Sequence, residues 1–366
     1  MAGNLKILMT ADTVGGVWTY ALGLCKALLK YDVEIHLLTM GALLTKEQSA
    51  QVQQLPNVNL YESNYKLEWM QDCWRDVQLA KQWITAIFSK VKPDLIHFNN
   101  YGQTLGSWSC PVITVYHSCV QTWWKAVKGE IPVQDWLRYI ETVRNAIAAS
   151  DVVVAPSKGM LEQARNVNGK FTNAEVIYNG LDIDIKDMPQ KAEFILSAGR
   201  IWDEGKNIQL LSDIAKEIHW PVCIAGNNID PDTGEAPKLE NVDFLGQLTN
   251  EEMQEYMAYA AVFVMPAKYE PFGLAILEAA KSSCALALAR LDTLQEIWGD
   301  AALYFDPFDE REAKSVIQEL VSNDRLRMKM SEKAFERAKK YSAEKMAQNY
   351  MQLYEKLLVP MNQTYN

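Results

Sequence analysis

The sequence predicts an α/β protein with two Rossmann-like domains in tandem. The chain has 366 residues, of which 49% are hydrophobic, and this length is enough for two cores of roughly 150 to 200 residues each. Short runs rich in β-branched residues alternate with helical patterns, which is typical of parallel sheets covered by helices. These runs fall into two series separated by a turn-rich segment, so we expect two parallel sheets.

The first series begins close to the start of the chain. A helical pattern over residues 17–31 separates the first two strand candidates, as expected for a strand, helix, strand unit. We expect the strands of the first sheet at residues 5–10, 33–40, 95–99, 112–116 and 152–156.

The second series follows a segment that has the composition of a linker. Residues 179–190 contain an Asn-Gly pair, several Asp residues and Pro189, and such residues favour turns. We expect a deep cleft between the domains to open there. The strands of the second sheet are expected at residues 194–199, 222–226, 242–245, 262–265 and 285–289.

The last helical pattern sets the domain boundaries. Apolar and aromatic residues recur at helical spacing over residues 342–358, and we expect this helix to cross back to the first domain. The expected domains are therefore a first domain of residues 1–183 with 342–366, and a second domain of residues 184–341.

Charge, cysteines and hydropathy exclude several classes of protein. The net charge is −10, and the acidic excess lies beyond residue 182, which is the opposite of a nucleic-acid binder. The six cysteines form no CxxC pair, so we expect core thiols and no disulfide or zinc site. No apolar run approaches the ~20 residues of a membrane span and the start lacks a signal-peptide pattern. We expect a cytoplasmic protein.

The most informative segment is residues 266–280, PAKYEPFGLAILEAA. It follows a buried strand and starts a helix near Gly273, where unpaired amides and the helix dipole can bind a diphosphate or sugar oxygens. The backbone of Phe272, Gly273 and Leu274 is therefore predicted to bind the ligand, and Gly273 allows close approach. Glu278 is placed to accept hydrogen bonds from neighbouring hydroxyls such as those of a ribose, and Glu270 lies on the loop.

Two cations follow the first strand of the second series, in GRIWDEGKN at residues 199–207. Arg200 and Lys206 can both reach a diphosphate lying over the helix N-terminus of that sheet. Negative charge that develops on phosphate oxygens would be stabilised by a fixed guanidinium and ammonium.

The first domain contributes a glycine pair and a histidine. Gly15-Gly16 lies between a strand and a helix but lacks G-x-G-x-x-G spacing, so hydride chemistry on a dinucleotide is disfavoured. His117 stands at the carboxyl end of a strand, where open α/β sheets bind ligands. The other histidines lack metal-ligand spacing and are interpreted as structural.

Two Asp-x-Asp triplets, residues 182–184 and 230–232, raise the question of a metal site. The first lies in the linker and the second in a loop containing Gly and Pro, so both are interpreted as turn chemistry. We expect no metal site.

These motifs together resemble the family 4 retaining glycosyltransferases, which have the GT-B fold. The resemblance rests on the Glu-x7-Glu pair Glu270 and Glu278 with an embedded Pro-Phe-Gly, and it covers nearly the whole chain. Further matches are Gly15-Gly16, His117, residues 178–182, Gly199-Arg200, Lys206-Asn207, Gly299-Asp300 and Asp306-Pro307.

The resemblance implies a role for each site residue. Glu278 would hold the ribose, Glu270 would lie near the 3-hydroxyl of the transferred sugar, and His117 would contact its 6-hydroxyl. The Gly15-Gly16 loop would close on the donor phosphates and the acceptor. Arg200 and Lys206 would stabilise the leaving diphosphate in place of a metal ion, and attack on the same face would retain the anomeric configuration.

The expected function is a metal-independent, retaining hexosyltransferase that needs no cofactor. It would move a hexose, best glucose, from a UDP-sugar to a sugar or lipid-linked acceptor in polysaccharide biosynthesis. Two alternatives stay open: a sucrose- or trehalose-type synthase with a small soluble acceptor, and a catalytically silent regulator that binds a nucleotide sugar. The intact set of Arg200, Lys206, Glu270 and Glu278 disfavours the silent regulator.

One segment could bring the protein to a lipid-linked acceptor. Residues 121–128 hold two tryptophans and two lysines and, with Lys66, Lys90, Lys92 and Arg138, could dock peripherally on the inner face of an anionic membrane.

The sequence departs from the family pattern in two places. Residues 281–283, Lys-Ser-Ser, stand where the family usually has a glycine, and residues 290–296 are predicted to form a loop that is usually glycine-rich in the family.

Overall fold

The computed structural model describes residues 4–132, 134–183, 189–230 and 233–359. The chain folds into two compact units. Unit 1 comprises Met1–Thr122, Ile131–Gly180 and Ala343–Asn366, and unit 2 comprises Trp123–Glu130 and Leu181–Ser342. This division differs from the expected domains in one main respect: residues 123–130, which we expected in the first domain, belong to unit 2. The expected boundary at 183/184 adjoins residues outside the described part of the chain.

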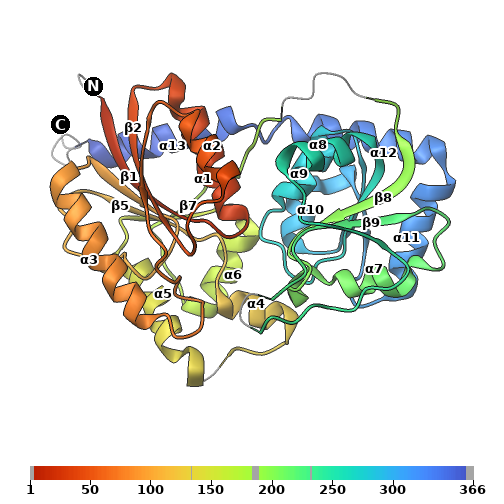
Figure 1. Cartoon of the computed structure of the whole chain (residues 1–366), viewed down its shortest axis with the longest axis horizontal. Coiled ribbons are helices and arrows are strands. Elements are labelled where there is room, and N and C mark those ends of the chain that lie inside the picture. Colours follow the sequence, from red (N-terminus) through yellow and green to blue (C-terminus); the bar gives the residue numbers. More distant parts are fainter. Residues whose placement is uncertain (1–3, 133, 184–188, 231–232, 360–366) are drawn as a thin grey trace. The chain divides into compact units, whose positions relative to one another are not determined.

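Unit 1 is built on a parallel sheet. In the described part of the chain this sheet has seven strands in the order β3-β2-β1-β4-β5-β6-β7, with helices on both of its sides (Figure 1). Strands β4, β5 and β6 are buried at every position, as in sheets covered on both faces. The strands are β1 (Leu5–Asp12), β2 (Val33–Met40), β3 (Val58–Glu62), β4 (Leu95–Phe98), β5 (Val112–Val115), β6 (Val152–Ala155) and β7 (Ala174–Val176).

The longer helices of unit 1 bury an apolar stripe. In α3 the buried residues Val77, Ala80, Ile84 and Ile87 recur at helical spacing. Burying a valine or isoleucine side chain stabilises the fold by roughly 1.5 to 3 kcal/mol. The helices are α1 (Gly16–Ala27), α2 (Lys46–Gln53), α3 (Trp74–Val91), the start of α4 (Val120–Val127), α5 (Leu137–Ala149), α6 (Lys158–Asn168) and α13 (Ala343–Leu358).

The last helix, α13, belongs to unit 1, as the sequence predicts. Its Tyr350 and Tyr354 are fully buried. The hydroxyl of Tyr20 donates to Tyr350 (2.6 Å) and the hydroxyl of Tyr354 lies 2.8 Å from Nδ1 of His97. Burial lowers the pKa of His97 to about 3, so its imidazole is a neutral structural group, as expected.

Unit 2 is built on a second parallel sheet, which in the described residues has six strands in the order β10-β9-β8-β11-β12-β13. Its first strand, β8, lies between β9 and β11. The chain runs from β8 outward through β9 to β10 and then crosses back to β11 on the other side of β8. Such a switch point places a crevice at the carboxyl ends of β8 and β11. The strands are β8 (Ala192–Ala198), β9 (Val222–Ala225), β10 (Asp243–Gly246), β11 (Ala260–Met265), β12 (Ala285–Ala289) and β13 (Leu303–Phe305).

The helices of unit 2 cover both sides of its sheet (Figure 1). Residues of α7 and α11 share one buried core with β8, β9, β11 and β12. The helices are α7 (Ile208–Ala215), α8 (Asn250–Tyr259), α9 (Leu274–Lys281), α10 (Asp292–Trp298), α11 (Glu310–Ser322) and α12 (Asp324–Ala338). Within the described ranges, no helix has the length and apolar character that crossing a membrane requires.

Candidate functional site

Two loops of unit 2 meet at the switch point. One is loop 199–207, which follows β8, and the other is loop 266–273, which follows β11. The carbonyl oxygen of Gly205 accepts hydrogen bonds from the amides of Lys268 (2.9 Å) and Tyr269 (3.2 Å). Nδ2 of Asn207 donates to the carbonyl oxygens of Pro266 (3.0 Å) and Pro307 (2.8 Å). These bonds hold the two loops, which carry the two predicted motifs, against each other.

The pair Lys206 and Glu270 joins the two loops through their side chains. Nζ of Lys206 lies 2.6 Å from Oε2 of Glu270, and the two side chains are only 16% and 10% exposed. From α10, Oγ1 of Thr293 donates to the carbonyl oxygen of Glu270 (2.6 Å). Each of these buried charges compensates the other, and removing either partner would leave the other charge buried and unpaired. The ion pair therefore stabilises the arrangement of the two loops.

Arg200 is held beside this pair. Its Nη2 lies 2.8 Å from Oδ2 of Asp203, and its guanidinium carbon lies 5.5 Å from the centre of the Trp202 ring. Burial would raise the pKa of Asp203, but Arg200, Lys206 and two donated hydrogen bonds outweigh it and hold this pKa below its usual value. Asp203 is therefore ionised and anchors Arg200, whose side chain remains 41% exposed.

The N-terminus of α9 lies directly after this pair, as predicted. Gly273 is the N-cap with φ +86°, and no side chain caps the helix. A Cβ at Gly273 would lie 2.6 Å from Cδ1 of Ile276, so this position requires glycine for both conformation and space. Phe272 is buried against Tyr341, with ring centres 5.7 Å apart. Phe272 and Leu274, the first helical residue, can thus serve a ligand through their backbones.

Glu278 lies on α9, partly buried. Burial raises the pKa of this carboxyl group to about 7. The Glu278 carboxyl group, which is predicted to bind the ribose, is therefore close to half protonated at neutral pH when no ligand is bound. Hydroxyl donors would favour its ionised form.

The affinity for UDP-glucose should rise with pH across neutrality. If Glu278 binds the ribose as the sequence predicts, the ribose hydroxyls donate to its carboxylate. Below the pKa of about 7 binding must then first remove a proton, and above it this cost disappears. We expect roughly tenfold weaker binding at pH 6 than at pH 8, because each pH step of one below the pKa costs about tenfold. Calorimetry in two buffers of different ionisation enthalpy measures the proton release. Glu278→Gln is the control, and an equal pH dependence in this variant would refute the assignment.

The glycine pair of unit 1 lies at the carboxyl end of β1. Gly15, with φ +90°, is the N-cap of α1 and Gly16 is its first residue. Both residues are exposed, and a Cβ at Gly16 would meet nothing within 4 Å. The loop thus presents open backbone at the edge of the sheet where ligands bind.

His117 follows β5 at the same edge of that sheet. Its Nε2 lies 2.8 Å from Oδ1 of Asn99, whose own Nδ2 donates to the carbonyl oxygen of Thr10 (2.7 Å). Since this bond fixes the amide orientation of Asn99, Nε2 of His117 must carry the proton. Burial lowers the pKa of His117 to about 3. Its neutral ring, packed edge-on against Tyr20 at 4.6 Å, keeps Nδ1 as an acceptor for a hydroxyl.

Neither Asp-x-Asp triplet can be judged completely, because residues 184 and 231–232 lie outside the described part. Asp182 lies 3.7 Å from Lys281. Oδ1 of Asp230 accepts from the amide of Thr233 (3.1 Å), which is turn geometry. Within the described ranges no three His, Cys, Asp or Glu side chains are grouped so that they could hold a metal ion.

The two departures from the family pattern both have a structural explanation. Ser283, just after α9, has φ +59°, a left-handed conformation that costs a non-glycine residue about 1 kcal/mol, which is why a glycine is usual there. Residues 290–296, which we interpreted as a loop, lie mostly in α10. That interpretation was wrong because the segment has no glycine and its Thr293, Leu294 and Ile297 pack in the core.

The residues that could form one membrane-docking patch belong to different units. Lys66, Lys90, Lys92 and Arg138 lie in unit 1, and residues 123–128 lie in unit 2. Lys128 forms an ion pair with Glu204, and Arg138 stacks over Trp74 at 4.3 Å. Part of the patch is thus engaged in contacts within each unit.

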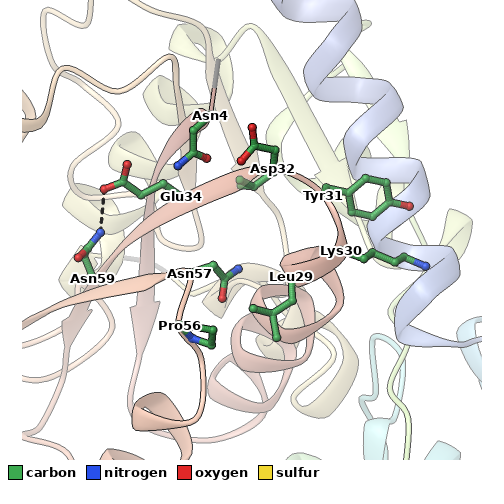
Figure 2. Close-up of a pocket in the computed structure, with 10 residues that line it drawn as sticks. Asn4, Leu29, Lys30, Tyr31, Asp32, Glu34, Pro56, Asn57 and Asn59 are labelled. Carbon is green, nitrogen blue, oxygen red and sulfur yellow. Dashed lines mark hydrogen bonds between the residues drawn. The ribbon is translucent and has the colours of Figure 1, made fainter. Parts of the chain in front are cut away.

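A hollow of about 490 Å³ in unit 1 contains none of the predicted site residues (Figure 2). It lies at the amino ends of β1, β2 and β3, the edge opposite the one where open α/β sheets bind ligands. Nδ2 of Asn59 donates to Glu34 across it (2.9 Å). We assign it no role. Its lining residues are Asn4, Leu29, Lys30, Tyr31, Asp32, Val33, Glu34, Pro56, Asn57 and Asn59.

The structure thus brings Arg200, Lys206, Glu270 and the start of α9 together in unit 2, and places Gly15, Gly16 and His117 at the corresponding edge of unit 1. Sequence reasoning gave no role to Asp203 or Thr293, and it considered Trp123 only as part of the segment 121–128 that could dock on a membrane. Asp203 lies inside the GRIWDEGKN motif, so its spacing from Arg200 was a usable signal. Thr293 and Trp123 carry no local signal.

Comparison with known proteins identifies glycosyltransferase sequences along most of the chain. A model described as Glycosyltransferase Family 4 matches residues 14–185, and one described as Glycosyl transferases group 1 matches residues 181–337. An uncharacterized glycosyltransferase of Methanocaldococcus jannaschii is 24% identical over 378 residues, covering 96% of this chain and 99% of that protein. O-antigen chain mannosyltransferase B of Escherichia coli is 30% identical over 116 residues, covering 32% of this chain and 30% of that protein.

Solved structures with the same fold match almost the whole chain. Sucrose-phosphate synthase from Thermosynechococcus elongatus has a TM-score of 0.81 at 17% identity and covers 96% of this chain and 99% of its own. Anabaena HepE in complex with UDP-glucose has a TM-score of 0.71 at 16% identity and covers 96% of this chain and 100% of its own. At these identities the likeness concerns the fold.

Proposed function

Because this chain belongs to the family 4 glycosyltransferases with the GT-B fold, we propose that it transfers a hexose from a UDP-sugar with retention of configuration. The best candidate for the sugar is glucose, and the acceptor is a sugar or a lipid-linked saccharide in polysaccharide biosynthesis. The observation that carries the proposal is the Lys206–Glu270 pair (2.6 Å) beside the open N-terminus of α9.

The chemistry follows from where charge develops. As the bond between the anomeric carbon and the β-phosphate oxygen breaks, the leaving diphosphate gains negative charge, which Arg200, Lys206 and the α9 N-terminus stabilise. The acceptor oxygen forms its bond to the anomeric carbon on the same face. Its proton passes to the leaving phosphate oxygen, so no carboxylate nucleophile is required.

The remaining residues hold the donor. Glu278 accepts from the ribose hydroxyls, and Glu270, oriented by Thr293, accepts from the transferred sugar near its 3-hydroxyl through the oxygen that Lys206 does not occupy. Nδ1 of His117 accepts from the 6-hydroxyl. The exposed backbone at Gly15 and Gly16 contacts the donor phosphates and the acceptor.

The choice of donor is supported by a protein with the same fold. The solved structure of Anabaena HepE is in complex with UDP-glucose. We propose a cytoplasmic enzyme, with peripheral contact at the inner face of the membrane if the acceptor is lipid-linked. A sucrose-type acceptor is the alternative that an acceptor screen would reveal.

A donor-hydrolysis screen tests the proposal. UDP-, GDP- and ADP-sugars are incubated with the enzyme without acceptor, and nucleotide release is measured. Release of UDP from UDP-glucose is the expected result. Tight binding of one donor with no release from any, with or without acceptors, would overturn the proposal and favour the silent regulator.

We predict that turnover needs no divalent metal. The diphosphate charge is met by Arg200, Lys206 and the α9 N-terminus, each of them a fixed positive element. Excess EDTA should therefore change the rate of UDP release by less than about twofold. Loss of activity in EDTA and its recovery with manganese would contradict this scheme, and Asp182-Ile-Asp184 and Asp230-Pro-Asp232 would then have to be examined as ligands.

A further inference from the structure

Trp123 makes an unexpected contact with loop 199–207. In the sequence it lies between β5 and β6 of unit 1, on α4, but it belongs to unit 2. Its indole Nε1 donates to Oδ1 of Asp203 at 2.9 Å. The same oxygen accepts from the amide of Gly205 (2.9 Å), and the other oxygen accepts from Arg200 (2.8 Å). Asp203 is only 6% exposed, so these three donors account for its known hydrogen bonds.

The fit around the indole is close. A Cβ at Gly205 would lie 2.6 Å from Nε1 of Trp123, so the indole reaches Asp203 only because residue 205 is a glycine. A few residues along, Lys128 of the same segment pairs with Glu204. Two polar contacts from residues 123–130 thus hold loop 199–207 from outside that loop.

We propose that Trp123 is a positioning residue for Arg200, acting through Asp203. The inference rests on the proposed function of Arg200 at the leaving diphosphate. A carboxylate held by three donors has little freedom to rotate, and its second oxygen then orients a guanidinium whose end is exposed for a ligand. Without the indole donor, Oδ1 keeps only the Gly205 amide, and Arg200 loses a fixed anchor.

The charges around Asp203 keep its carboxylate ionised. Asp203 is faced by Arg200 and Lys206, and the neighbouring Glu204 is paired with Lys128 and Lys268. Burial would raise the pKa of Asp203, but the two cations and the hydrogen bond from Trp123 keep it low. The carboxylate therefore stays charged at neutral pH and can anchor the Arg200 guanidinium.

The test compares Trp123→Phe with the control Trp220→Phe, which changes another partly buried tryptophan of unit 2, one that packs against Arg327. With UDP-glucose, Trp123→Phe should lower kcat about 10- to 100-fold, the range expected when a group is misplaced by up to about 1 Å, and leave KM within about threefold. Trp220→Phe should match the wild type. Equal kcat in both variants would overturn the proposal and leave Trp123 a packing residue.

A readout without turnover separates this proposal from the proposed function. In ¹⁵N-indole NMR spectra the resonance missing in Trp123→Phe identifies Trp123, and Asp203→Asn should shift that resonance while leaving those of other indoles in place. Trp123→Phe should also weaken UDP binding severalfold in calorimetry. If no donor is ever turned over, the proposed function fails. An indole resonance insensitive to Asp203→Asn, or unchanged UDP affinity, would refute the positioning role instead.

Discussion

Replacing Arg200 or Lys206 with Ala should lower the rate of UDP release by about 10²- to 10³-fold, the range seen when one preorganised stabilising group is removed. Both side chains carry a fixed positive charge at the carboxyl edge of the unit 2 sheet. They act on charge that develops in the transition state, so kcat should fall by more than KM rises. Steady-state kinetics with UDP-glucose measures the effect.

The two variants need different controls. Arg200→Ala leaves Asp203 with its bonds from Trp123 and Gly205, so its fold should be kept. Lys206→Ala leaves the buried Glu270 unpaired, and breaking such a pair costs roughly 3 to 5 kcal/mol, so its stability must be measured beside its rate. Lys314→Ala, which removes the exposed pair with Glu217, should keep full activity. Arg200→Ala with wild-type kcat would exclude the electrostatic role.

Replacing Glu278 with Ala should weaken UDP binding by an order of magnitude or more at pH 8. An ionised carboxylate that accepts two hydroxyl hydrogen bonds contributes roughly 1.5 to 3 kcal/mol for each before water compensates. The measurement belongs above the pKa of about 7, where the wild-type group is ionised. Calorimetry with UDP, with the exposed Glu251→Ala on α8 as control, isolates the effect. Unchanged affinity would remove Glu278 from the site.

The two-sheet fold could be predicted because its central strands have strong local patterns. Residues 33–40 and 285–289 are strands with the bounds expected from their apolar runs. Strands β3, β7 and β13 were not predicted, since β3 lies at the sheet edge with partly exposed residues, and β7 and β13 have three residues each. The placement of residues 123–130 in unit 2 was also not predictable, because it depends on contacts such as Trp123 with Asp203 and not on local pattern.

The candidate site divides in the same way. Glu270, Gly273 and Arg200 lie in short motifs whose order along the chain predicts a shared crevice, and the structure brings them together. Thr293 and Trp123 were missed because each acts through one tertiary hydrogen bond. The protonation state of Glu278 was missed as well, since burial and not sequence raises its pKa to about 7.

The most direct test of the account is hydrogen–deuterium exchange with and without saturating UDP, read by mass spectrometry. The central claim is that a nucleoside diphosphate binds where loop 199–207 meets the start of α9. Protection should therefore appear in peptides covering residues 199–207 and 266–278, and it should be lost in Lys206→Ala and Glu278→Ala. Protection confined to other segments, such as the hollow at residues 29–34 and 56–59, or no protection at all, would contradict the claim.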